Sequence, residues 1–166
     1  MPSTIMGLPA HPLIIHAVVV LIPLAALSAI VVAIWPAARE RYASLALGVA
    51  TVALVAIPLA THTGELLEAH VKRTPLVERH TEMADGLLPF AALLWLGLAV
   101  LVFVRWYGAK RNVQWGRYLT VAAAIVAVVG AVASGVQVAR IGHSGAAAAW
   151  HGVDTSSSGQ AARGHR

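Results

Sequence analysis

Four long apolar stretches constrain the fold of this chain more than any other feature of its sequence. They cover about residues 12–35, 42–62, 84–106 and 117–140. Each has about the 20 apolar residues that a helix needs to cross the hydrocarbon core of a bilayer. None alternates apolar and polar residues as a strand does, and a backbone in lipid must satisfy its hydrogen bonds internally. We therefore predict an all-α fold, a polytopic membrane protein built as an antiparallel bundle of four transmembrane helices.

The composition excludes several other classes of protein. Hydrophobic residues make up 58% of the 166 residues and charged residues 11%, whereas a soluble domain has about 25% charged residues. An ordinary soluble domain, a disordered chain and a coiled coil are all excluded by this difference. The chain has no cysteine, which also excludes disulfides, thiolate metal sites, Cys-ligated iron–sulfur clusters and covalently attached c-type haem.

The sequence predicts one domain followed by a short tail. The transmembrane domain is expected to occupy residues 1–153. Residues 154–166 are rich in Ser, Gly, Ala and Arg, a composition typical of disorder. The ten residues before His11 contain no Lys or Arg, so the first apolar stretch is interpreted as a retained helix rather than a cleaved signal peptide.

Lysine and arginine predict how the bundle is oriented. The loops expected after the first and third stretches are basic, with Arg39, Arg41, Arg105, Lys110, Arg111 and Arg117. The positive-inside rule places these segments in the cytoplasm and both termini outside it. This topology also accounts for the net charge of +5, so nucleic-acid binding is not expected.

The histidines all fall on one side of the predicted bundle. The chain has eight of them, His11, His16, His62, His70, His80, His143, His151 and His165. Because the four helices alternate in direction, all eight positions come to the same side of the membrane. This holds whether that side is the cytoplasm or the outside. Imidazole is a common metal ligand and also ligates haem iron, and helix bundles hold cofactors with ligands from facing helices. Of the eight, His70 and His165 are expected to be solvated.

His16 is the most informative of these histidines. It lies about 7 Å along the helix axis from His11, at 1.5 Å per residue, and an ionisable residue at that depth indicates function. The alternative is that its ring bonds a carbonyl or a neighbouring helix. His11 precedes Pro12, so we expect it to be extended, at the mouth of the bundle, as an outer ligand or a cap.

Four further histidines lie at the ends of the other stretches. His62 ends the second stretch and faces either the interior or the membrane surface. His80 precedes the third stretch. His143 lies in the segment Gly142–Gly145, where glycines allow the backbone to turn in closely. His151 is either a ligand or an interfacial residue.

Charged residues accompany the histidines on the same side. Glu65, Glu68, Glu82 and Asp85 flank the second and third stretches, and Arg140 ends the fourth. One interpretation is snorkelling and surface ion pairs. The other is that a carboxylate orients a ligand histidine and that Arg140 pairs with a haem propionate or another anion.

Two segments of the chain resemble a known family. The opening segment His11–His16, with the sequence HPLIIH, is similar to the HPxxxH start of a bacterial four-helix membrane family, domain-of-unknown-function 2231. The closing segment resembles it too, in Ser134–Gly135, Gly142–Gly145 and Trp150–Val153, as does the position of His80. The resemblance covers residues 7–153. It implies four helices in a bacterial inner membrane, and it favours electron transfer because members resemble redox-associated proteins, some joined to Rieske or cytochrome-like modules.

The first functional hypothesis is a membrane b-type cytochrome. A haem b near the outer face would be ligated by His16 and by a second histidine, with His80 or His143 ahead of His62. Arg140 would be the residue that binds its propionates. Electrons would pass from a quinol or another redox protein partner to an external carrier.

Two alternatives remain open at this point. The second hypothesis is a zinc or copper site built from His11, His16, His62, His80, His143 and His151. No hydrolytic signature such as HExxH is present, so no catalytic residue is assigned and an enzymatic function is neither predicted nor excluded. The third hypothesis is an accessory or structural subunit whose histidines respond to pH or bind an anion. The lipid bilayer is the expected surrounding, and homo-oligomerisation is left open.

Overall fold

The computed structural model describes residues 4–5, 8–69, 73–111 and 115–150, and this part of the chain is almost entirely helical. Its helices are α1 (Ala10–Ile34), α2 (Pro36–Glu68), α3 (Pro75–Asp85), α4 (Leu87–Arg111) and α5 (Trp115–Trp150). Before α1, the two-residue strands β1 (Thr4–Ile5) and β2 (Leu8–Pro9) pair antiparallel. The tail predicted to be disordered, residues 154–166, lies outside the described residues.

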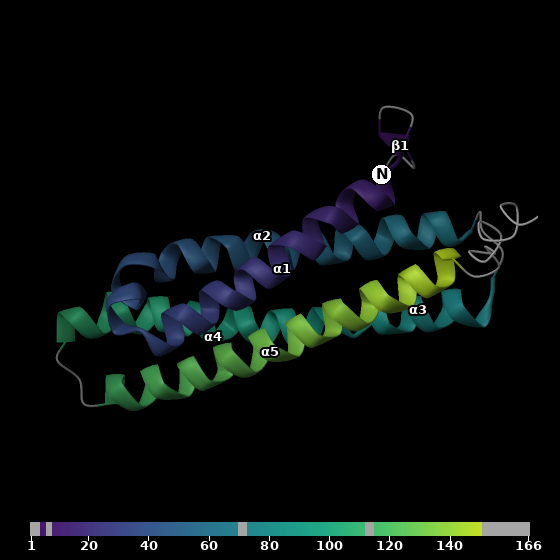
Figure 1. Cartoon of the computed structure of the whole chain (residues 1–166). Coiled ribbons are helices and arrows are strands. Elements are labelled where there is room, and N and C mark those ends of the chain that lie inside the picture. The colour runs from purple at the N-terminus through teal and green to yellow at the C-terminus, as the bar shows by residue number, and fades with distance from the viewer. Residues whose placement is uncertain (1–3, 6–7, 70–72, 112–114, 151–166) are drawn as a thin grey trace, which may run out of the picture.

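The helices confirm a four-helix membrane bundle. Four helical units are long and apolar enough to cross a membrane, and α3 with α4 counts as one of them because the two meet at Gly86. In Figure 1 the start of α1, the end of α2, helix α3 and the end of α5 lie together at one end of the bundle. We call this the histidine end. The opposite end holds the junctions of α1 with α2 and of α4 with α5.

Two helices extend well beyond the predicted spans. Helix α2 has 33 residues and α5 has 36, so each is about 50 Å long at 1.5 Å per residue. The hydrocarbon core is only about 30 Å thick. At the histidine end α2 continues to Glu68, past the predicted boundary at residue 62, and α5 continues to Trp150, past the predicted boundary at residue 140. These extensions are about two and about three helical turns long.

Two local predictions were wrong. Residues 36–41 are helical rather than a loop, because Pro36 takes the first position of α2 and its fixed φ suits a helix start. Only Trp35 separates α1 from α2. The segment Gly142–Gly145 is helical rather than a turn. It is followed by Ala146–Ala149, and alanine has the highest helix propensity.

Small residues allow the helices to approach closely in the core. The buried side chains include many alanines, among them Ala25, Ala29, Ala43, Ala46, Ala53, Ala91, Ala123, Ala127 and Ala131. Between α4 and α5 the backbones themselves touch, since a Cβ added to Gly97 would lie 2.5 Å from the Ala127 nitrogen. A Cβ added to Gly130 would overlap the backbone of Leu94. Such packing is the main source of helix association in lipid, where burial of apolar surface contributes little.

The outer surface of the bundle suits lipid. Large apolar side chains are exposed on every long helix, for example Val20, Leu27, Leu45, Val55, Phe103 and Ile125. Aromatic side chains gather at the end opposite the histidines, with Trp35, Tyr42, Trp106, Tyr107, Trp115 and Tyr118 all exposed. Tryptophan and tyrosine are typical of the membrane–water interface. The bilayer is therefore the environment of this chain.

Candidate functional site: a pair of histidines at one end of the bundle

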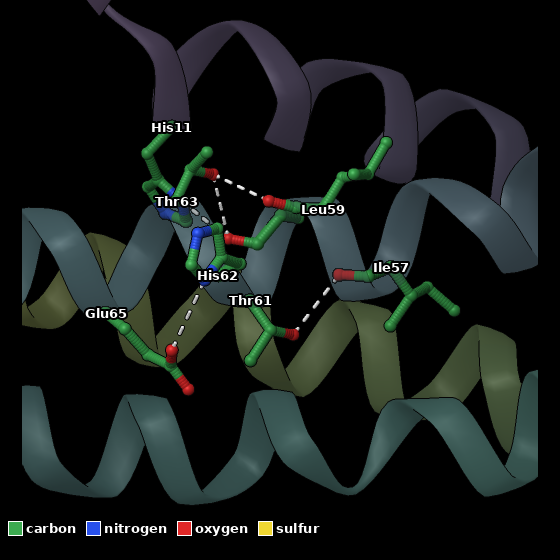
Figure 2. Close-up of polar contacts among 8 residues, drawn as sticks. His11, Ile57, Leu59, Thr61, His62, Thr63 and Glu65 are labelled. Carbon is green, nitrogen blue, oxygen red and sulfur yellow. Dashed lines mark hydrogen bonds and ion pairs between the residues drawn. The ribbon is translucent and has the colours of Figure 1, made fainter. Parts of the chain in front are cut away.

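His11 lies in the first turn of α1 and is partly buried against α2. Its Nδ1 is 3.1 Å from the carbonyl oxygen of Ala60, and since a carbonyl only accepts, this ring nitrogen donates. One turn further along α2, a Cβ added to Gly64 would lie 3.1 Å from Cε1 of His11. Helix α2 therefore offers this ring both a hydrogen-bond acceptor and the space to pack closely (Figure 2).

The backbone at His11 differs from the prediction. The residue is helical rather than extended, because α1 begins at Ala10, one residue before it. Pro12 is then near the start of the helix, where its missing N–H has no carbonyl partner to lose. His11 does lie at the mouth of the bundle, where the sequence placed it.

His80 makes a matching set of contacts with α5. Its Nδ1 is 3.0 Å from the hydroxyl oxygen of Ser144. That hydroxyl donates its hydrogen to the Ile141 carbonyl, 2.9 Å away, so Ser144 accepts from His80 and the Nδ1 of this ring also donates. A Cβ added to Gly145 would lie 3.0 Å from Cε1 of His80. The second ring is therefore also packed against a glycine of a neighbouring helix.

His11 and His80 are close enough to each other to interact electrostatically. We call these two residues the histidine pair. In the neutral form, a ring that donates from Nδ1 keeps a lone pair on Nε2. Metal-binding histidines are oriented in this way, with the second ring nitrogen donating to a carbonyl or another acceptor. All four helical units of the bundle contribute, because α1 and α3 supply the rings and α2 and α5 supply their partners.

The other histidines of the described residues are exposed. His16 contacts the Pro12 carbonyl of its own helix through Nδ1. The Nδ1 of His62 lies 3.8 Å from the carboxylate of Glu65. His143 is exposed on α5. The structure thus places His11 and His80 within electrostatic range of each other and leaves these three at the surface.

The remaining predicted site residues are placed as follows. Arg140 is exposed on α5, one turn before Ser144. His151, His70 and His165 lie outside the described residues. Within residues 8–69, 73–111 and 115–150, no group of three or more His, Asp or Glu is arranged to hold a metal ion.

A comparison with protein families agrees with this architecture. The family model described as a predicted membrane protein, DUF2231, matches residues 7–157. The chain belongs to this family. The DUF2231 match includes the opening motif His11–His16 and the whole of α1 to α5, so the resemblance found in the sequence is confirmed. A search of the curated proteins and a search of the solved structures each found no match.

Gln137 fixes the position of α3, and sequence reasoning missed it. Its Nε2 donates to the Met83 carbonyl at 2.7 Å, one of the last carbonyls of α3, which lack a partner within their own helix. Gly86 allows this approach, since a Cβ there would lie 3.2 Å from Nε2 of Gln137. Met83 is one turn after His80, so the contacts of Gln137 and Ser144 together hold α3 on α5. A lone glutamine in an apolar span was the signal for it.

Replacing Gln137 with leucine is expected to loosen α3. The change leaves the Met83 carbonyl without its donor, a loss of about 1 kcal/mol or about fivefold in an opening equilibrium. Hydrogen exchange of the α3 amides in detergent-purified protein should accelerate by about that factor. Thr120→Val is the matched control on α5, because its hydroxyl donates to the Gly116 carbonyl of the same helix. Unchanged exchange in Gln137→Leu would contradict this role.

Proposed function

We propose that this DUF2231 protein is a membrane-embedded redox protein that binds a metal centre through His11 and His80. The observation that supports the proposal most strongly is that both rings use the same nitrogen, Nδ1, as a hydrogen-bond donor. Each packs against a glycine of a neighbouring helix and donates from Nδ1, which leaves both Nε2 atoms for a metal. Ligands from separate helices at one end are the way in which helix bundles hold cofactors.

Haem b is the centre that we propose, and copper is the alternative. Haem iron accepts imidazole as a ligand, and His11 and His80, on different helices, are the residues that would hold it. Structural zinc takes four ligands and catalytic zinc takes three from the protein, and the described residues contain no such group. Copper also accepts imidazole and needs no space for a porphyrin between the helices.

Residues at the same end of the bundle support such a centre. The core cluster at this end contains Val18, Ile22, Leu87, Val138 and Ile141, and an apolar surface of this kind would suit a cofactor. Arg140 is the cation that would bind haem propionates, since guanidinium pairs well with carboxylates. A bound haem or copper would supply a one-electron redox couple, with a membrane quinol or another redox protein as its partner.

A titration of the metal-free protein tests this proposal. We expect detergent-purified chain to bind one equivalent of haemin, with a Soret band typical of histidine-ligated haem. If the centre is copper instead, one equivalent of Cu(I) binds and haemin binds no better than it does to detergent alone. The function proposed here would be contradicted if neither probe bound with a stoichiometry near one.

The topology that we propose places the histidine end outside the cytoplasm of a bacterial inner membrane. The absence of cysteine makes single-cysteine labelling a direct test. Glu78→Cys on α3 should react with a membrane-impermeant maleimide in intact spheroplasts. Ala37→Cys at the start of α2 should react only after the membrane is permeabilised. Both positions are exposed, but helix α3 and the start of α2 lie at opposite ends of the bundle (Figure 1). The reverse pattern would overturn this orientation.

A further inference from the structure

A groove lies between α2 and the junction of α3 with α4. Its volume is about 230 Å³, smaller than the 300–1,000 Å³ of a pocket for a drug-sized molecule. Its apolar part is formed by Ile57, Pro58, Ala84 and Leu88, and its polar part by Thr61, His62, Glu65 and Asp85. The groove therefore has room for the polar head of an amphiphile, with an apolar surface beside it.

Along the axis of the bundle, the groove lies at the edge of the hydrocarbon core of the bilayer. On α2, Glu65 is the first charged residue after Arg41. On the other wall, Asp85 is the last charged residue before Arg105. The groove thus spans the level at which each helix changes from charged to apolar sequence. Lipid-soluble molecules with a polar head have that head at this level.

The polar side of the groove offers mostly hydrogen-bond acceptors, and the His62 ring in the same lining has both a donor and an acceptor nitrogen when neutral. The carboxylates of Glu65 and Asp85 only accept when ionised, and both residues are exposed to solvent. The Thr61 hydroxyl donates its hydrogen to the Ile57 carbonyl, 3.2 Å away, so toward the groove it presents lone pairs. Among the residues that the structure describes, no lysine or arginine lines the groove. A ligand that suits this lining therefore carries hydrogen-bond donors and no negative charge.

We propose that this groove binds the diphenol head of a membrane quinol. A quinol has two O–H donors on a compact ring and an apolar tail that continues into the lipid. The oxidised quinone has only acceptors, so it can pair with an N–H of His62 but not with Thr61, Glu65 or Asp85, and it fits this lining less well. The lining thus selects the reduced form.

The choice of a quinol over an amphiphilic amine rests on the function proposed above. Thr61 and Glu65 face the groove, whereas Ala60 and Gly64 of the same helix contact His11. In Figure 2 His11 approaches α2 from one side, and Thr61 and Glu65 point away from it. The groove and His11 thus lie on different faces of α2, a helix about 10 Å across with its side chains. A reductant bound there would lie next to the redox centre.

Binding of decylubiquinol to the metal-free chain in phosphatidylcholine nanodiscs tests the groove directly. Bound quinol is measured after separation of the discs, with empty nanodiscs as the baseline. We expect saturable binding of one quinol per chain, about tenfold tighter than decylubiquinone, since a hydrogen bond to a charged acceptor contributes about that factor. Leu88→Trp should abolish it by filling the groove, whereas Leu96→Trp, exposed on the same helix and outside the groove, should not.

The polar lining is tested by removing charge. Asp85→Asn and Glu65→Gln should each weaken quinol binding by about tenfold, and Glu78→Gln, an exposed carboxylate outside the groove, should leave it unchanged. Binding no greater than that of empty nanodiscs would overturn the quinol site, even if the histidine pair binds its metal. Displacement by dodecylamine at equal or lower concentration would also overturn it, in favour of a cation site. Because the metal-free chain is used, failure of the metal proposal leaves this measurement intact.

Discussion

Replacing His80 with glutamine is expected to abolish binding of the metal centre while the bundle stays folded. The glutamine amide is able to donate to Ser144 as the ring does, but it has no imidazole nitrogen for a metal. Even changes to groups that only orient a ligand weaken metal binding by about 10- to 100-fold, so loss of a ligand should exceed about 100-fold. His11→Gln should have the same effect. The measurement is haem or copper per chain after purification, together with the affinity of the apo variants.

Two variants serve as matched controls for this prediction. His16→Gln and His143→Gln change exposed histidines at the same end, and both should keep the full content of the centre. Ser144→Ala should retain the fold but weaken binding by about 10- to 100-fold, because it removes the acceptor that orients His80. If His16→Gln loses the centre and His80→Gln keeps it, the ligand assignment is wrong.

Replacing Gly130 with alanine is expected to have the largest effect on the stability of the bundle. The added Cβ would overlap the backbone of Leu94, which cannot move aside as a flexible side chain does. Overpacking costs about 1–3 kcal/mol, and we expect the upper part of this range because helices α4 and α5 would have to separate. Gly97→Ala should act in the same way against Ala127. Unfolding by sodium dodecyl sulfate, followed by tryptophan fluorescence, measures the loss.

The same helices supply the controls for the steric argument. Gly135 follows Gly130 on α5, and Gly48 lies on α2. A Cβ added to Gly135 or to Gly48 would meet nothing within 4 Å. Alanine at these positions should be neutral or should stabilise its helix by up to about 1 kcal/mol. If Gly135→Ala and Gly48→Ala destabilised the bundle as much as Gly130→Ala does, close packing at Gly130 would not explain the loss of stability.

The helical architecture follows from the sequence because bilayer thickness and backbone hydrogen bonding leave little choice. Runs without charge, such as residues 42–64 and 86–104, have to be helices that cross the bilayer. The ends of the helices are harder to predict, because outside the hydrocarbon core hydropathy no longer selects the structure. Local propensity and packing then decide, as in Pro36 at the start of α2 and the alanines after Gly145.

The candidate site was predicted in part. The sequence gathered the histidines at one end but favoured His16, which lies five residues after His11. At 100° per residue, five residues turn a helix by about 140°, so the two rings cannot face the same neighbour. Hydropathy carries no information about rotation around the axis. That rotation is set by contacts such as His11 with Gly64, which depend on the packing of two helices.

The hydrogen-bond acceptors of the histidine pair could not be predicted from the sequence for a related reason. The acceptor for His11 is the backbone carbonyl of Ala60, and every residue has such a group. Ser144 and Gly145 were noted as part of a glycine-containing segment, but their role depends on the antiparallel contact of α3 with α5. Carboxylates were the acceptors that the sequence suggested. In the structure Glu65 instead lies near the exposed His62.

A metal centre at the histidine pair is tested most simply by an absorbance spectrum of protein purified from a host supplied with haem. The spectrum is recorded oxidised and then after reduction with dithionite, and metal content is measured in the same sample. We expect one haem per chain with a Soret band that shifts and sharpens on reduction, or one copper per chain without such a band. A chain that holds neither haem nor copper would contradict this expectation and would favour an accessory subunit whose histidines bind no metal.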